Sequence, residues 1–383
     1  MPANIATLKN IVIEQPQFSL RNFCGKYKAL PDNNSILASG GLRTKGMYKK
    51  TTKDKPLVTF ITSVRNNKDG IEKCMESIWN QTYDNIEYIV VDGASTDGTV
   101  ELLFKNEDKI DYFVSEPDEG IYYAYNKALS LATGDVIAII NSDDWAFPNA
   151  AMIAATNFQS EKFDMLFGVA MYHDVDGHEL YRYPPFIMNE GSILLGTPVC
   201  HNATYFSRSA YEKVGYYSKS LPIAADFNWM IDAWLIGAKI SYSQDMFVHY
   251  SLGGTSDNLE KYTKDAVEII IDKVSDLSTE EATVLVKHFC MFYPTRYFSQ
   301  EDKLKIGEIV DKHKNNSLLL MMILKCLLFS KTAQYEDLAS TKLELISGSR
   351  LIEVFLKNKI ADLLRNTFLF RPAQRLYQLF KKN

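Results

Sequence analysis

Two adjacent carboxylates follow a run of apolar residues in the segment AIINSDDW (138–145). Asp143 and Asp144 stand where a buried strand should end, and two negative charges are costly there unless a cation lies between them. Oxygen ligands without nearby cysteine or histidine suit Mg²⁺ or Mn²⁺, which proteins hold through one or two carboxylates and substrate phosphates. The alternative is that the pair belongs to an ordinary turn or helix cap.

Another carboxylate, Asp92, ends an apolar run in VVDGASTDGT (90–99). The small residues after it would let a nucleotide approach the backbone, and the carboxylate could accept hydrogen bonds from a base or ribose. A plain strand–turn–helix connection is the alternative. The segment has neither the GxGxxG dinucleotide fingerprint nor the GxxxxGK[ST] phosphate loop, so neither of those sites is predicted.

Alternating strands and helices must position these residues. The segment LVTFITSV (57–64) is apolar and β-branched, which predicts a fully buried strand, and further strands are predicted at 86–92, 110–115 and 135–140. Four strands separated by helices indicate a parallel, doubly wound sheet, in which ligands bind beyond the carboxyl ends of the strands. We therefore expect one edge of the sheet to gather Arg65, Asn66, Asp92, Glu116, Asp118, Asp143 and Asp144.

The helices between the strands are predicted from their spacing and caps. The first carries Ile71, Met75 and Ile78 on one face. The second is expected to begin at Ser95 or Thr96 and to turn inward the residues Val100, Leu103 and Phe104. The third is expected at 120–132, and its N-terminal side holds Asp118, for which capping alone is an alternative role.

The second half of the chain is less regular. A Val-Asp-Gly turn predicts a hairpin at 165–183, and a strand is predicted at 201–208. A helix is predicted at 224–237, near whose start Asp226 could be stabilised by backbone amides or act as an N-cap. A strand pair with a glycine-rich loop is predicted at 239–256 and helices from about 258 onward.

Composition excludes several classes of protein. The 383 residues carry a net charge of −5, which does not favour a nucleic-acid binder. The five cysteines are scattered without CxxC spacing, so we expect free thiols in a reducing cytoplasm rather than disulfides or a zinc site. No signal peptide is recognisable, and the apolar run at 318–324 is far shorter than the ~20 residues of a membrane span.

The last part of the chain, 355–383, combines basic residues with apolar residues at helical spacing. Such a basic amphipathic helix can lie on the inner face of a membrane, which would make the protein peripheral there. Helices that pack on the rest of the protein and expose a basic face are the alternative.

Four motifs occur in order: VRN (64–66), VVDGASTDGT, SEPDEGIYYAYNKALSLATGD (115–135) and NSDDW (141–145). Together they resemble the family 2 inverting glycosyltransferases of the GT-A fold, in particular bacterial enzymes that build surface polysaccharides such as O-antigen, capsule or exopolysaccharide. The resemblance covers roughly residues 56 to 255. It implies a lead-in segment (1–55), a GT-A catalytic domain (56–257) and a helical C-terminal region (258–383).

The resemblance also implies roles for single residues. Asp92 would recognise the nucleotide base, with Arg65 and Asn66 beside it and Asp118 facing the donor sugar. The tripeptide Ser142-Asp143-Asp144 matches the family's DXD-type element, in which Asp144 would bind Mn²⁺ or Mg²⁺ and Asp143 would face the ribose; the departure from the literal Asp-x-Asp spelling leaves this division open.

On the acceptor side, Asp226 matches the position of the family's catalytic base, which takes the proton of the attacking hydroxyl. His201 lies in the segment that approaches the acceptor, and His249 is a candidate third metal ligand, because some GT-A enzymes use a late histidine. The loop Gly253-Gly254-Thr255-Ser256 could wrap the diphosphate with its amides.

The resemblance thus implies a hexosyl- or N-acetylhexosaminyltransferase that uses a nucleotide-diphosphate sugar, with a UDP-sugar as the first candidate donor, and a glycan acceptor carried on a polyprenyl diphosphate. A sugar nucleotidyltransferase is one alternative, but SVRNNKDG (63–70) offers too few glycines and basic residues to hold a triphosphate. A non-catalytic sugar-nucleotide-binding scaffold is the other. The joint presence of Asp92, Asp144 and Asp226 argues against it.

Overall fold

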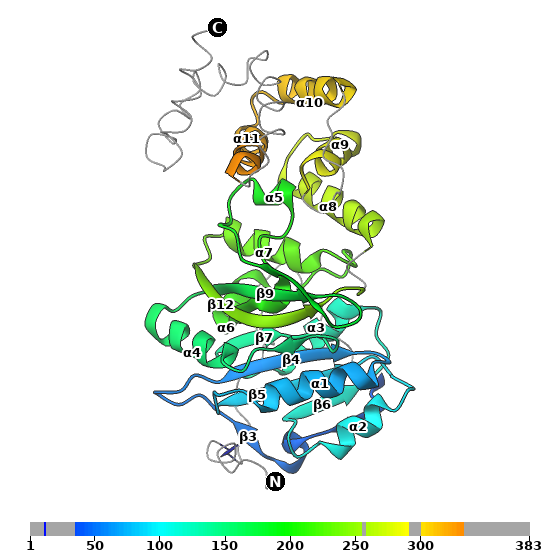
Figure 1. Cartoon of the computed structure of the whole chain (residues 1–383), viewed down its shortest axis with the longest axis vertical. Coiled ribbons are helices and arrows are strands. Elements are labelled where there is room, and N and C mark those ends of the chain that lie inside the picture. Colours follow the sequence, from blue (N-terminus) through cyan, green and yellow to red (C-terminus); the bar gives the residue numbers. More distant parts are fainter. Residues whose placement is uncertain (1–10, 13–34, 255–257, 291–299, 333–383) are drawn as a thin grey trace. The chain divides into compact units, whose positions relative to one another are not determined.

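A computed structural model describes residues 11–12, 35–254, 258–290 and 300–332. The described residues belong to two compact units. One draws on Met1–Ile187 and Thr197–Asp265, and the other on Met188–Gly196 and Ala266–Asn383. The first unit contains the sheet and every residue discussed as a site, while the second is helical (Figure 1).

A single mixed sheet of ten strands forms the first unit, in the order β2-β6-β5-β4-β7-β11-β9-β12-β8, with β10 paired to β9. Its centre is parallel: Val58 pairs with Ile86 on one side and with Val136 on the other. The predicted α/β fold with a doubly wound, mostly parallel sheet is confirmed. The four strands of this centre are β4 (Val58–Val64), β5 (Ile86–Asp92), β6 (Tyr112–Ser115) and β7 (Val136–Ile139).

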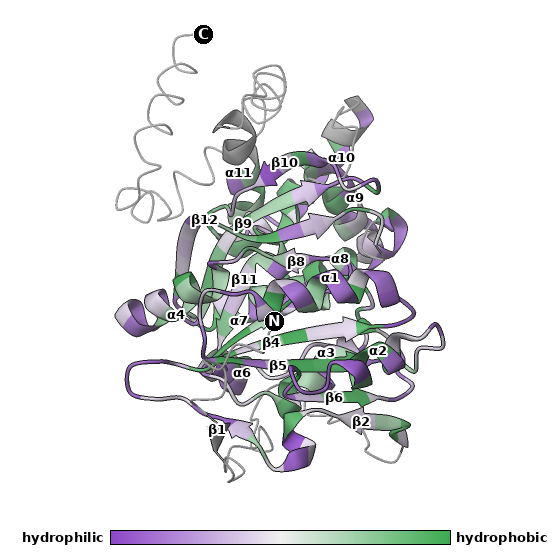
Figure 2. Cartoon of the chain, turned by 60° about the horizontal axis from the view of Figure 1, so that its bottom comes forward, coloured by the Kyte–Doolittle hydropathy of each residue, from purple (hydrophilic) through white to green (hydrophobic). Residues whose placement is uncertain are grey.

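Every residue of β4 and β5 is buried, as expected for parallel strands covered on both faces. Figure 2 shows these strands mainly in green and white, whereas purple residues concentrate on helices and loops. Two carboxylates of β5 are buried, Glu87 and Asp92. Glu87 is paired with Arg43 and accepts hydrogen bonds from Thr59 Oγ1 and from Thr133. The charge of Glu87 inside the sheet is therefore compensated by an ion pair and by hydrogen bonds.

Helix α1 (Lys68–Trp79) follows β4 and buries the predicted face, with Asn67 Oδ1 as its cap. Helix α2 (Thr99–Lys105) differs from the prediction, because it begins after Gly98 and its first turn is held by Asp97, whose Oδ1 accepts from Thr99 N at 3.0 Å. The early start predicted at Ser95 or Thr96 is wrong because Ser95 N instead donates to Asp92.

The face that α2 buries also differs from the prediction. Leu102 and Leu103 are buried, but Val100 is only half-buried and Phe104 is exposed. Phe104 contacts the ring of Phe113 edge-on at 4.9 Å, so its position is still fixed by the sheet. Helix α3 (Ile121–Leu131) ends at Ala132, as its sequence indicated.

The second half adds an antiparallel hairpin and two further strands. Strands β9 (Met165–His173) and β10 (Glu179–Tyr183) form the predicted hairpin. Residues 201–203 are a 3-10 turn, and only β11 (Thr204–Ser207) is a strand, antiparallel to both β7 and β9.

The strand pair predicted at 239–256 is wrong. A single long strand, β12 (Ile240–Ser251), runs parallel to β9 and is bent by register shifts between Tyr242 and Val248. Its end pairs antiparallel with the short β8 (Trp145–Ala146). The register shifts interrupt the pairing with β9 without ending the strand.

Gly168 of β9 allows β12 to lie close. A Cβ at this position would lie 2.3 Å from the ring of Phe247, so no side chain fits there. The remaining helices of this unit are α4 (Ala150–Glu161), α6 (Arg208–Val214) and α7 (Ala225–Leu235).

One strand of the described lead-in segment joins this sheet, and two others form a separate two-stranded sheet. Strand β2 (Ala38–Gly40) pairs antiparallel with β6, and β3 (Tyr48–Lys49) pairs with β1 (Ile11–Val12). Lys49 forms a buried ion pair with Asp111 at 2.8 Å. The domain boundary placed after residue 55 stays a prediction.

The helical unit contains α5 (Ser192–Leu195), the end of α8 (Leu259–Lys273), α9 (Thr279–Phe289), α10 (Gln300–Lys312) and α11 (Ser317–Thr332). A capping box formed by Ser278 and Glu281 begins α9. No helix in the described ranges combines the length and the hydropathy needed to cross a bilayer. The basic tail at 355–383 lies outside the described residues.

Candidate active site

The carboxyl ends of the parallel strands bring the predicted residues to one edge of the sheet. Asp92 ends β5 and is completely buried. Its Oδ2 accepts hydrogen bonds from Ser95 N at 2.9 Å and from Ser115 Oγ at 2.6 Å. Its Oδ1 is also buried but has no hydrogen-bond partner among the described residues. One acceptor at this edge is therefore left for a group from outside the protein.

The chain around Asp92 is fixed by an exchange of hydrogen bonds between two loops. Asn66 N donates to Ser95 Oγ at 2.7 Å, and Thr96 N donates to Asn66 Oδ1 at 2.8 Å. Asn66 and Ala94 both have left-handed backbone angles, with φ of 50° and 59°. Strained backbone of this kind persists only where the surroundings enforce it and is frequent at ligand sites.

Arg65 and Asp118 meet at Gly93. A Cβ on this glycine would lie 2.9 Å from Asp118 Oδ2 and 3.3 Å from Arg65 Cδ, so the two charged side chains border the same short backbone segment. Burial raises the pKa of Asp118, which the charge of Arg65 partly offsets. Asp118 Oδ1 also accepts from Gly120 N at 3.1 Å, the capping contact that the sequence offered as an alternative.

Asp143 and Asp144 differ in their surroundings. Asp143 is exposed, whereas Asp144 is only 1% exposed. Asp144 accepts hydrogen bonds from Asn202 Nδ2 and from Ser251 N, the latter at 2.7 Å. Burial, and then the charge of Asp143, raise the pKa of Asp144 well above its ordinary value. Within the described ranges no lysine or arginine forms an ion pair with it, so no protein cation compensates its ionised form.

Asp226 lies in the first turn of α7, as predicted, with its side chain 23% exposed. Tyr122 OH lies 2.9 Å from Asp226 Oδ1 and 2.6 Å from Ile223 O. The hydroxyl has one hydrogen for these two acceptors. The carboxylate therefore has a neighbour that can donate to it or accept from it.

His201 connects Asp226 to a group of buried tyrosines. Its Nδ1 lies 4.0 Å from Asp226 Oδ2, and its Nε2 lies 3.0 Å from Tyr217 OH. Tyr217 OH in turn lies 2.7 Å from Tyr211 OH. Burial lowers the pKa of His201, and the charge of Asp226 opposes this effect only in part. The net shift favours the neutral ring.

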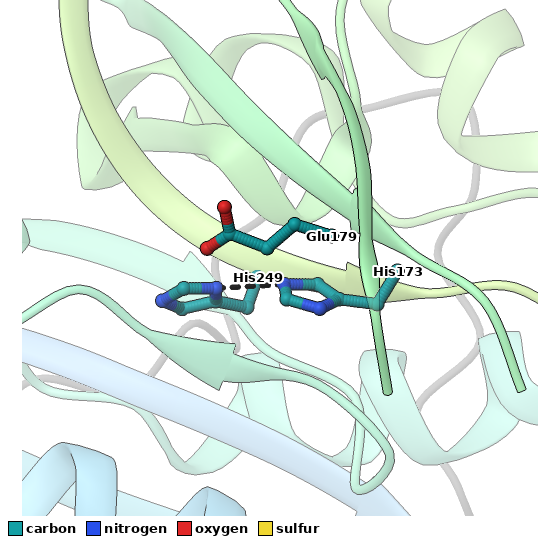
Figure 3. Close-up of side chains that lie close together, drawn as sticks. All are labelled: His173, Glu179 and His249. Carbon is teal, nitrogen blue, oxygen red and sulfur yellow. Dashed lines mark hydrogen bonds between the residues drawn. The ribbon is translucent and has the colours of Figure 1, made fainter. Parts of the chain in front are cut away.

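His249 lies in a cluster with His173 and Glu179. Its Nδ1 lies 2.8 Å from His173 Nε2, and Glu179 completes a cluster whose ligand atoms all lie within 4.8 Å of one another (Figure 3). Burial, and then the charges of His173 and Lys73, lower the pKa of His249 to about 4. In the glycine-rich loop, Gly253 and Gly254 are described, whereas Thr255 and Ser256 lie outside the described residues.

Several residues of the site were not singled out from the sequence. Asn202 and Ser251, which are 58 and 107 residues from Asp144 in the sequence, donate hydrogen bonds to its carboxylate. Tyr217 contacts His201. Tyr122, which contacts Asp226, belongs to the same group. Asn202 directly follows His201 in the acceptor-side segment, which was the only clue to it.

Comparison with known proteins identifies the family of this chain. Residues 59–230 match the family model described as glycosyl transferase family 2. An uncharacterized glycosyltransferase of Mycobacterium tuberculosis is 34% identical over 186 residues, which cover 47% of this chain and 70% of the relative. Chondroitin synthase of Escherichia coli is 26% identical over 194 residues, covering 49% of this chain and 28% of that protein.

Among solved structures, S. aureus TarS 1-349 in complex with UDP-GlcNAc matches with a TM-score of 0.49 and 18% identity, covering 74% of this chain and 89% of that one. The family match and the mycobacterial relative confirm the resemblance inferred from the four motifs. The chain belongs to the family 2 glycosyltransferases.

Proposed function

We propose that this glycosyltransferase transfers a sugar, with inversion, from a nucleotide-diphosphate donor to a hydroxyl of a growing glycan. The observation that carries the proposal is the gathering of Asp92, Asp118 and Asp144 at the carboxyl edge of the parallel strands, where Asp92 ends β5 and the other two lie on separate loops. A donor lying along this edge would meet a base site, a sugar site and a metal site in turn.

The nucleotide would bind at Asp92. Its unpartnered Oδ1 is an acceptor for an N–H of the base, and the fixed loops of Asn66 and Ser95 present the backbone beside it. Arg65 supplies a positive charge next to Gly93, and Asp118, close to it, is placed for hydroxyls of the donor sugar. UDP is the first candidate nucleotide.

The residues at Asp144 fit a divalent metal. Asp144 is a buried carboxylate without a cationic partner in the described part of the chain, and the exposed Asp143 is next to it. Asp144 would hold Mn²⁺ or Mg²⁺ and Asp143 would face the ribose or share the ion. When bound, such an ion neutralises the charge that develops on the leaving diphosphate. His249 was the candidate third ligand, but its Nδ1 faces His173 instead.

Asp226 would act as the base. As the acceptor oxygen bonds to the anomeric carbon, the bond from that carbon to the diphosphate breaks and the diphosphate leaves with its electron pair. The hydroxyl proton passes to the Asp226 carboxylate. Tyr122 and the neutral His201 lie beside that carboxylate and would orient it and the acceptor.

We also propose that the product is a bacterial surface polysaccharide, built on a lipid-linked acceptor at the inner face of the membrane. The relation to chondroitin synthase, which is named for a polysaccharide, supports the glycan part of this proposal. The lipid carrier is what the family resemblance implies, and the peripheral membrane location rests on the basic amphipathic pattern of 355–383. The donor sugar, the linkage and the detailed acceptor need a screen of UDP-sugars.

Calorimetric titration of the full chain with UDP tests the proposal, first with Mn²⁺ and then with EDTA, in the native protein and in Asp144→Ala. We expect metal-dependent binding that weakens roughly 100-fold in the variant, because several kcal/mol of the interaction come from the metal contact. Asp108→Ala is the control, since Asp108 is exposed near the opposite edge of the sheet, just before β6. Failure of UDP, GDP and dTDP to bind with either metal would contradict the proposal, and binding without any transfer would favour a scaffold.

A further inference from the structure

We propose that His173, Glu179 and His249 form a site for a transition-metal ion such as Zn²⁺, separate from the metal site proposed at Asp144. Two histidines and one glutamate are a ligand set that proteins use for zinc. Each residue offers one ligand atom, and the three atoms all lie within 4.8 Å of one another. This inference does not depend on the proposed donor or reaction.

The sheet brings the three residues to one face. Glu179 of β10 stands directly opposite His173 of β9, and His173 stands opposite Ser251 of β12 in the parallel ladder. His249 is two residues before Ser251 and therefore points to the same face. Three adjacent strands thus present one ligand each, and Figure 3 shows the Glu179 carboxylate beside the paired rings.

The hydrogen bond of His173 Nδ1 fixes the tautomer in which the Nε2 lone pair can bind a metal. Its Nδ1 lies 3.2 Å from Gly177 O, and because a carbonyl can only accept, Nδ1 carries the hydrogen. The lone pair of Nε2 therefore points at His249 Nδ1, 2.8 Å away. A backbone carbonyl behind a ligand histidine is the usual outer-shell arrangement of zinc sites.

The two histidine nitrogens require only a small adjustment. Two nitrogen ligands on a tetrahedral zinc, with bonds of roughly 2.0–2.1 Å, lie about 3.3 Å apart. The two rings are 2.8 Å apart at the nitrogens that would bind the metal. They need to separate by about 0.5 Å as the ion replaces the hydrogen they share, which is within the freedom of two side chains.

Aromatic rings fix His249 and cover the site, and one side stays open. His249 stacks on Phe147 at 3.9 Å and on Trp145 at 4.7 Å, with an interplanar angle of 14° in both cases. His173 is 3% exposed, whereas Glu179 is exposed and leaves an entrance for the ion. The carboxylate also compensates part of the ion's charge.

The choice of metal follows from the ligands. Imidazole nitrogens favour zinc and its neighbours over Mg²⁺, which prefers oxygen. Asp144 does not belong to this cluster.

A second cluster in the hairpin turn, Asp174, Asp176 and His178, is mostly exposed, and Asp174 already accepts hydrogen bonds from the backbone of Asp176 and His178. We assign no metal to it.

Cobalt titration of the full-length chain tests the site. The protein is first treated with a chelator, desalted, and titrated with Co²⁺ without nucleotide, and then with Zn²⁺ in competition. We expect one equivalent of Co²⁺ with the absorption of a tetrahedral nitrogen–oxygen site, displaced by Zn²⁺ but not by excess Mg²⁺.

Two variants remove ligands with little risk to folding. Glu179→Gln changes an exposed side chain and should weaken binding about 10- to 100-fold. His249→Phe keeps the stacking on Trp145 and Phe147 and should weaken it at least about 100-fold. His178→Ala, on an exposed histidine of the same hairpin, and Asp144→Ala should leave the affinity unchanged.

Four results would overturn the assignment: no stoichiometric Co²⁺ or Zn²⁺ binding, an affinity unchanged in both ligand variants, loss of binding in His178→Ala, or loss in Asp144→Ala. The last result would mean that Co²⁺ occupies the proposed donor-metal site. UDP binding with Mn²⁺ is measured separately, so a failure there leaves the zinc result intact.

Discussion

Asp92 and Asp144 stand at the same edge of the sheet but are held in different ways. Asp92 is fixed by Ser95 and Ser115, which are 3 and 23 residues away in the sequence. Asp144 is fixed by Asn202 and Ser251, which are 58 and 107 residues away. The proposed nucleotide site is thus built within the parallel half of the sheet, residues 58–139. The proposed metal site needs contacts from the second half of the chain, beyond residue 200.

Asp226 belongs to the second half, and its removal should have the largest effect. Asp226→Asn should lower turnover by about 10²- to 10⁴-fold, because the base is lost, while nucleotide binding through the parallel half stays nearly unchanged. Transfer from a UDP-sugar and UDP binding are measured on the same preparation.

Asp232→Asn, on the same helix beyond its first turn, is the matched control for that experiment. Weakened nucleotide binding together with retained turnover would show that Asp226 contributes to the donor side and would remove the distinction between the two halves.

The contact between β9 and β12 offers a way to disturb the second half alone. Gly168→Ala places a methyl group 2.3 Å from the ring of Phe247 and should cost about 1–3 kcal/mol of the free energy of unfolding, measured with urea. Because β12 also carries Ser251, metal-dependent UDP binding should weaken as well.

Adding Phe247→Leu to Gly168→Ala should recover part of the loss, since the clash is with that ring. If the two substitutions are additive in stability, or if metal-dependent binding is untouched, then β12 does not position Asp144 in the way described.

The smallest expected effect concerns the helical unit, which lies outside both halves of the site. Burial alone would raise the pKa of Glu281, but hydrogen bonds from Lys312, Ser278 and His313 lower it to about 2 from its ordinary 4.5. A carboxylate with a lowered pKa stabilises the fold above pH 4.5, and this stabilisation is lost as the pH falls toward 2.

The difference in urea midpoint between the native chain and Glu281→Gln should therefore be largest at neutral pH and shrink on acidification. A difference that grows as the pH falls would mean that the ionised carboxylate is not the stabilising form. Metal-dependent UDP binding should be the same in both proteins.

The sequence predicted the parallel half well because its information is local. Strand bounds at 57–64 and 86–92 followed from apolar runs, and the polar residues after each strand lie at the same edge for topological reasons. The errors in this half were also local. Asp92 accepts a hydrogen bond from Ser95 N, so α2 begins after Gly98 and buries Leu102 in place of Val100.

The second half was less predictable because its contacts depend on strand pairing. Nothing in the spacing of His173, Glu179 and His249 indicates that three strands bring them together, and Asn202 has no motif that ties it to Asp144. The single strand β12 was mistaken for two because register shifts let it carry polar residues without a turn. Roles assigned by resemblance, including those of Asp226 and His201, remain predictions.

Tyr122 has a consequence for how Asp226 could change its protonation state. When the carboxylate is ionised, the tyrosine hydrogen can turn toward it. When the carboxylate is protonated, it can donate to the tyrosine oxygen, and the tyrosine hydrogen turns to Ile223 O. The same heavy-atom positions of Tyr122, Asp226 and Ile223 therefore serve both states, because the tyrosine hydroxyl can rotate between its two neighbours.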